Sequence, residues 1–137
     1  MKDNNQKIIK NEIYTQNDIN YNDYFREIYS ILTEIEVISS DINYRLFLKN
    51  ELLYNTLNSM LYHLQLIIKN IDVITLEKYP YVEWSYLLNI YDNINHVNYS
   101  LSYDLLWDFI KLKLKFIKRA LLPIVECCSH YNCSCFI

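Results

Sequence analysis

Glycine is absent from the 137-residue chain, and proline occurs only twice, as Pro80 and Pro123. Phosphate-cradling loops, dinucleotide-binding fingerprints and tight hairpin turns all need a residue without a Cβ atom, so the lack of glycine argues against each of them. Two prolines also argue against an all-β fold with many sharp turns. The length suits one domain, and a composition with 52% hydrophobic and 21% charged residues is that of a globular protein.

Strong charge and long apolar runs are also missing. The formal net charge is −3, so the chain has no overall basic field, and we expect no nucleic-acid partner. No run of about eighteen apolar residues occurs, so we expect no transmembrane segment. The first residues are polar and lack the apolar core of a secretory signal. We therefore expect a cytosolic protein with reduced thiols.

Helical periodicity is the strongest structural signal, and it runs from residue 20 to residue 122. Apolar residues at intervals of three, four and seven predict a helix over 22–39 and a second helical stretch over 41–71. The second stretch would be longer than a small domain is wide. We therefore expect a break near Asn50 or within 55–59.

The segment 72–79 is expected to be a short helix or a connector that ends before Pro80, and the same spacing predicts two more helices, over 82–95 and 102–122. In the last of them a helical wheel places Phe116 on the core side, and Pro123 is expected to end the helix. We thus predict an all-α fold, a compact bundle of about five helices. Residues 1–19 are expected to be a flexible N-terminal arm, and residues 123–137 a cysteine-rich C-terminal tail.

The stretch 41–71 is apolar on two opposite sides. One stripe consists of Leu46, Leu53, Leu57, Met60, Leu64, Ile67 and Ile71. The opposite stripe consists of Tyr44, Leu48, Leu52, Tyr62 and Leu66. We expect another helix to cover the opposite stripe, because large exposed apolar patches are rare on monomers. The alternative cover is a partner, either a second copy or an amphipathic helix.

A partner-binding groove is the sharper hypothesis for that side. In this hypothesis Tyr62 and Leu66 border the groove, and Trp84 and Leu87 form its far wall. Tryptophan is a common interface anchor. The alternative interpretation is that Trp84 packs in the core, as most large aromatic residues of a small bundle do.

Five of the thirteen cations cluster in the last predicted helix. They are Lys111, Lys113, Lys115, Lys118 and Arg119. One interpretation is contact with an anionic surface such as lipid headgroups or nucleic acid. The other is a solvated outer face, which late cations on a helix favour through the helix dipole.

All four cysteines lie in the tail, between Cys127 and Cys135, together with His130. The ligands of a zinc site are usually spaced more widely than these, so we expect no metal site and no cofactor. A metal-bound tail, S-acylation of the tail and a plain reduced tail all remain open as alternatives. Cys128 and His130 are too close together in the tail to form a positioned catalytic pair. We therefore expect a protein that is not an enzyme.

Two segments, 43–57 and 99–117, resemble helices of the poxviral Bcl-2-like proteins in their pattern of apolar and polar residues. The second is similar to the C-terminal helix of family members that block innate immune signalling. The resemblance implies a Bcl-2-like bundle, an antagonist of host innate immune signalling or apoptosis, and a location in the host cytoplasm. The implied partners are a host signalling or apoptotic protein and a second copy in a homodimer. The alternative function is a membrane-apposed helical adaptor, tethered by an S-acylated cysteine tail.

Overall fold

The computed structural model describes residues 20–128, and all regular structure in that range is helical. The predicted all-α class is therefore confirmed for the described residues. The expected arm, 1–19, and most of the expected tail, 129–137, lie outside that range. The bounds of the elements are α2 (Asn22–Ser39), α3 (Tyr44–Leu48), α4 (Glu51–Lys69), α5 (Val73–Glu77), α6 (Trp84–Asn95), α7 (Tyr99–Asp108), the π-helical turn η1 (Phe109–Lys113) and α8 (Leu114–Cys128).

Asparagine caps explain where several of these helices begin. The side chains of Asn43, Asn50 and Asn98 each accept a hydrogen bond from a backbone N–H in the first turn of the helix that follows, all at 2.9 Å. Such caps satisfy donors that the helix itself cannot pair. The expected break at Asn50 is confirmed. The last predicted helix begins at Tyr99 rather than at residue 102.

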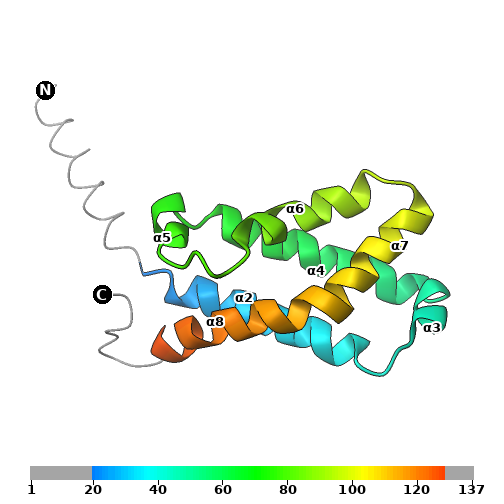
Figure 1. The fold of residues 1–137 in the computed structure, drawn as a ribbon, viewed down its shortest axis with the longest axis horizontal. Helices are drawn as coiled ribbons and strands as arrows, with labels where there is room; N and C mark the ends of the chain where they lie inside the picture. The colour runs from blue at the N-terminus through cyan, green and yellow to red at the C-terminus, as the bar shows by residue number, and fades with distance from the viewer. Residues whose placement is uncertain (1–19, 129–137) are drawn as a thin grey trace, which may run out of the picture.

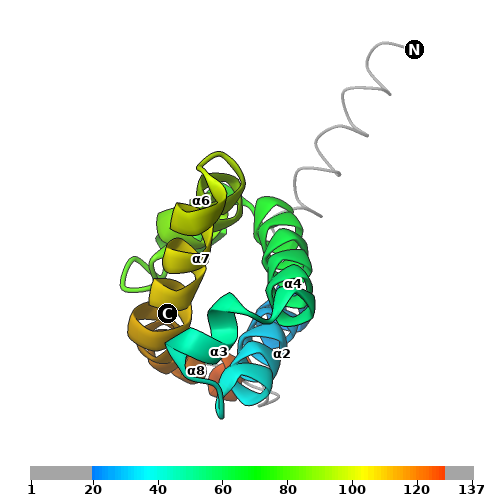
Figure 2. The same cartoon turned by 90° about the vertical axis from the view of Figure 1, so that its right-hand side faces the viewer.

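The long helices form a closed ring around one core. Helix α2 packs against α8 and α4, α4 packs against α6, and α6 packs against α7, which continues through η1 into α8 (Figure 2). The one-turn helix α3 lies at one end of this bundle and α5 at the other (Figure 1). Leu57 and Leu64, two members of the first apolar stripe, are fully buried between the helices.

The π-helical turn η1 changes which residues of α8 face the core. The backbone N–H of Leu114 bonds to the carbonyl oxygen of Phe109, five residues back instead of four. The extra residue in the turn rotates all that follows it. Leu114 thereby becomes buried, and Phe116 is 62% exposed. The expectation that Phe116 lies on the core side is wrong for this reason.

Helix α8 continues past Pro123 to Cys128, so the prediction that Pro123 ends the last helix is wrong. Proline usually interrupts a helix because it lacks an N–H and crowds the carbonyl four residues earlier. Pro123 lies on the exposed side of α8, where water can reach that carbonyl. Ile124, one residue further on, is buried in the core. The helical bundle therefore extends beyond the boundary expected at residue 122.

Candidate functional site

The four residues of the predicted groove do not share a surface. Tyr62 and Leu66 are exposed on α4, but Trp84 is 8% and Leu87 0% exposed. The indole N–H of Trp84 donates a hydrogen bond to the carbonyl oxygen of Tyr79 at 3.0 Å. The expectation that Trp84 and Leu87 form the far wall of a groove is therefore wrong, because both belong to the core.

Among residues 20–128, no other helix buries the opposite stripe of the stretch 41–71. Its five side chains, Tyr44, Leu48, Leu52, Tyr62 and Leu66, are between 41% and 78% exposed. The expectation of internal cover is wrong because α2 and α6 pack against α4 without burying Leu52, Tyr62 or Leu66. The other two residues belong to α3, where the ring of Tyr44 lies 5.5 Å from that of Trp107 of α7. The Tyr62 ring makes one local contact, with Tyr91 of α6 at 5.0 Å between ring centroids.

Leu66 borders a shallow pocket between α2 and α4 with a volume of about 370 Å³. Its other lining residues are Tyr24, Glu27, His63, Ile67 and Asn70. The His63 Nε2 atom lies 3.3 Å from a carboxylate oxygen of Glu27. Polar and charged side chains thus make up half of the lining of this pocket, which is a poorer match to an apolar partner than the groove described next.

A second, larger groove lies beside α3, and we call it the α3 groove. Its volume is about 530 Å³. Its lining residues are Val37, Ile38, Asp41, Ile42, Leu46, Lys49, Asn50 and Leu53. Val37 at the end of α2 is 65% exposed, and Leu46 of α3 is 52% exposed. Five of the eight lining residues are apolar. The lining also includes one acidic and one basic residue, Asp41 and Lys49.

One residue fixes α3 to the body of the protein. Phe47 is the buried side chain of this single turn. Its ring lies 5.4 Å from the ring of Tyr103 and 5.3 Å from that of Trp107, both on α7. The hydroxyl of Tyr44 also donates a hydrogen bond to Asp104. Phe47 and Tyr44 thus hold α3 against α7, and Leu46 of the same turn lines the groove.

Aromatic side chains extend this anchor into the end of the core. Tyr103 stacks on Tyr54 at 4.2 Å between centroids, and the hydroxyl of Tyr54 is hydrogen-bonded to Ser102. Burial is the main cause that raises the pKa of Tyr103 above its usual value. The hydrogen bond to Asp104 raises the pKa of Tyr44. Both tyrosines therefore stay neutral at physiological pH, so the cluster is an uncharged support for α3.

The basic cluster of the last helix is partly used within the fold. Lys113 forms an ion pair with Glu83 at 2.7 Å, and Lys118 forms one with Glu36 at 2.8 Å. Both ammonium groups also lie over aromatic rings, those of Tyr86 and Tyr29 respectively. Lys113 therefore connects η1 to the start of α6, and Lys118 connects α8 to α2.

The structure also bears on metal ligands, membrane-spanning helices and the state of the thiols. Within residues 20–128, no group of histidine, cysteine and carboxylate side chains is placed to hold a metal ion. None of the helices described is long and apolar enough to cross a membrane. Cys127 is disulfide-bonded, so the expectation of reduced thiols does not hold for this residue. His130 and the cysteines beyond Cys128 lie outside the described residues.

No protein-family model, curated protein or solved structure matches this chain. The resemblance to the poxviral Bcl-2-like proteins therefore stays a hypothesis.

Sequence reasoning did not find the α3 groove. Val37, Ile38 and Ile42 lie at the end of one helix and in the loop after it, where periodicity carries no information about exposure. The periodicity places Leu46 in the core stripe because it treats 41–71 as one helical stretch, whereas α3 and α4 are separate helices. The two asparagine caps, seven residues apart, were the usable signal, because they mark a one-turn helix that can bury only one side chain well.

Proposed function

We propose that this chain is a protein-binding module without enzymatic activity, and that its α3 groove takes an apolar segment of a partner protein. The exposed apolar side chains around α3 carry the proposal, because contiguous apolar surface on a soluble domain commonly marks an interaction site. Val37, Leu46, Leu48 and Leu52 are all exposed at this end of the bundle.

The exposure of the groove favours a protein over a small molecule. The groove volume of about 530 Å³ alone is within the range of small-molecule sites. Small-molecule sites, however, bury most of the ligand, whereas Val37 and Leu46 of the lining are 65% and 52% exposed. An amphipathic helix laid in the groove would cover both side chains, with its charged groups next to Asp41 and Lys49.

The family resemblance gives this proposal its more specific form. In that form the partner is a host signalling or apoptotic protein, and the chain antagonises host innate immune signalling or apoptosis in the host cytoplasm. The exposed apolar surface supports binding to a protein. The affinity capture described next identifies which protein it is.

Two matched substitutions test the groove. Leu46→Asp puts a charge into the groove, and Ile74→Asp puts the same charge on an exposed residue at the opposite end of the bundle. Affinity capture from host cells, read by quantitative mass spectrometry, nominates partners. Titration calorimetry with the purified partner then measures direct binding.

We expect Leu46→Asp to weaken this binding at least tenfold and Ile74→Asp to leave it unchanged. Both variants should keep the helical circular dichroism spectrum, because neither position is buried. Equal binding by wild type and Leu46→Asp would contradict the proposal. Sedimentation velocity on the same samples shows whether the groove instead takes a second copy of this chain.

A further inference from the structure

The outward side of η1 and α8 carries cations that the described part of the fold does not use in ion pairs. One of them, Lys111, lies over the Trp107 ring, with its Nζ 4.7 Å from the ring centroid. Lys111, Lys115 and Arg119 recur at every fourth residue and are exposed. No ion pair with a carboxylate of the described residues involves any of these three side chains. Lys115 and Arg119, four residues apart, lie on one side of α8, and Lys111 precedes them in the turn η1. We call these three charges the cationic row.

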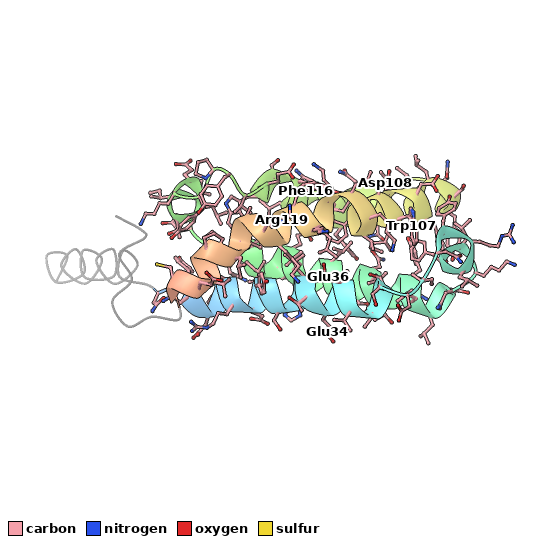
Figure 3. All side chains as sticks on the ribbon, turned by 60° about the horizontal axis from the view of Figure 1, so that its bottom comes forward. Glu34, Glu36, Trp107, Asp108, Phe116 and Arg119 are labelled. Carbon is pink, nitrogen blue, oxygen red and sulfur yellow. The ribbon has the colours of Figure 1, made fainter. Side chains whose placement is uncertain are left out.

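Apolar side chains run beside this row. Leu112 and Phe116, also four residues apart, are 61% and 62% exposed. The guanidinium group of Arg119 lies 6.0 Å from the centre of the Phe116 ring. Figure 3 shows Phe116 and Arg119 on α8, while Glu34 and Glu36 belong to the neighbouring α2. We call these five residues, Lys111, Leu112, Lys115, Phe116 and Arg119, the α8 strip.

The shape of the α8 strip distinguishes it from the α3 groove. The inward side of the same helix, with Leu114, Ile117 and Leu121, is buried. The strip is therefore a convex ridge about 12 Å long from residue 111 to residue 119. A ridge can lie on a flat surface, whereas binding a partner helix usually requires a groove.

From these observations we propose that the α8 strip docks the protein reversibly on membranes that contain anionic lipids. Lys111, Lys115 and Arg119 would contact the negative headgroups, while Leu112 and Phe116 enter the boundary between headgroups and acyl chains. A cationic row beside an apolar row is the pattern of helices that lie in a membrane interface. Because the strip is short and bracketed by Asp108 and Glu126, the docking is weak and sensitive to salt.

Vesicle flotation with the purified full-length chain tests this docking. The vesicles are either pure phosphatidylcholine or phosphatidylcholine with about a third of phosphatidylserine, at about 0.1 M and about 0.5 M NaCl. We expect binding to the phosphatidylserine vesicles at low salt, weaker binding at high salt, and none to pure phosphatidylcholine.

Substitutions locate the contact. Lys115→Gln with Arg119→Gln should weaken vesicle binding about thirtyfold, because each cation near an anionic surface contributes about one factor of five. The matched control is Lys69→Gln with Lys78→Gln, which removes the same charge from exposed sites on other parts of the bundle. Phe116→Ser should weaken binding while its salt dependence persists.

Circular dichroism confirms that each variant is folded. Absence of wild-type binding to phosphatidylserine vesicles at low salt would overturn the proposal, and so would equal binding by the α8 variant and the control. Binding to an acidic helical peptide in place of the vesicles would also overturn it and would assign the strip to a protein partner.

Discussion

Replacing Phe47 by alanine should destabilise the protein and disrupt the α3 groove together. Phe47 is fully buried and is the residue through which α3 packs on the core. Truncating a buried phenylalanine typically costs about 3–5 kcal/mol, because the ring loses its burial and leaves a cavity. The contacts with the rings of Tyr103 and Trp107 add a further contribution that alanine cannot supply.

The expected loss is large compared with the total stability of a small domain. The free energy of unfolding of such domains is about 5–15 kcal/mol. A loss of about 3–5 kcal/mol should therefore lower the urea concentration at the unfolding midpoint strongly. Urea unfolding followed by far-ultraviolet circular dichroism measures the global free energy. Tryptophan fluorescence adds a local signal, because Trp107 lies against Phe47.

An exposed phenylalanine provides the matched control. Phe116→Ala removes the same ring from the surface of α8, so we expect a change within about 0.5 kcal/mol. Partner binding in the α3 groove should be lost in Phe47→Ala even where the variant is folded, because α3 is no longer held. A loss of stability below about 1 kcal/mol for Phe47→Ala would refute the role of this residue as the anchor of α3.

Three further predictions concern the core, the end of α8 and a half-buried tyrosine. Leu57→Ala should lower the free energy of unfolding by about 2–5 kcal/mol in urea titrations, since Leu57 is fully buried. Ile124→Ala should lower the thermal midpoint clearly more than Leu122→Ala, because Ile124 is buried beyond Pro123 and Leu122 is partly exposed; equal midpoints would show that α8 contributes nothing past the proline. Burial, followed by the charges of Glu83 and Asp108, raises the pKa of Tyr86 from 10.0 to about 12. The neutral form is therefore favoured in the folded state, so this contribution is present below about pH 10 and is lost as the pH rises from about 10 to about 12. Urea midpoints at about pH 8 and about pH 11 should differ less in Tyr86→Phe than in wild type.

Periodicity and capping predicted the helices where local rules decide the structure. The end of α2 at Ser39 and the break at Asn50 follow from polar residues that interrupt an apolar repeat. The short helix α5 ends before Pro80 as expected, because the residue before a proline avoids helical angles. Each of these signals acts within a few residues and needs no knowledge of the packing.

The errors occur where packing decides. A wheel with a constant angle cannot foresee η1, so it placed Phe116 in the core. Pro123 does not stop α8, because the burial of Ile124 holds the helix together beyond it. Tyr62 and Leu66 continue an apolar stripe, but no helix in the described part of the chain buries that side of α4. These outcomes depend on which helices become neighbours, and a single sequence does not contain that information in a readable form.

Both candidate surfaces arise where the regular helical repeat is interrupted. A continuous α-helix buries one stripe of its apolar residues and exposes its polar ones. Between Asn43 and Asn50 the chain makes one separate turn, which buries Phe47 and leaves Leu46 outside. At η1 the extra residue buries Leu114 and leaves Phe116 outside. Neither side chain is withdrawn from water on folding, so neither adds to the stability of the isolated chain. Single exposed apolar residues are common on protein surfaces, so the two interruptions explain where these surfaces lie, and the substitutions at Leu46 and Phe116 test what each surface contacts.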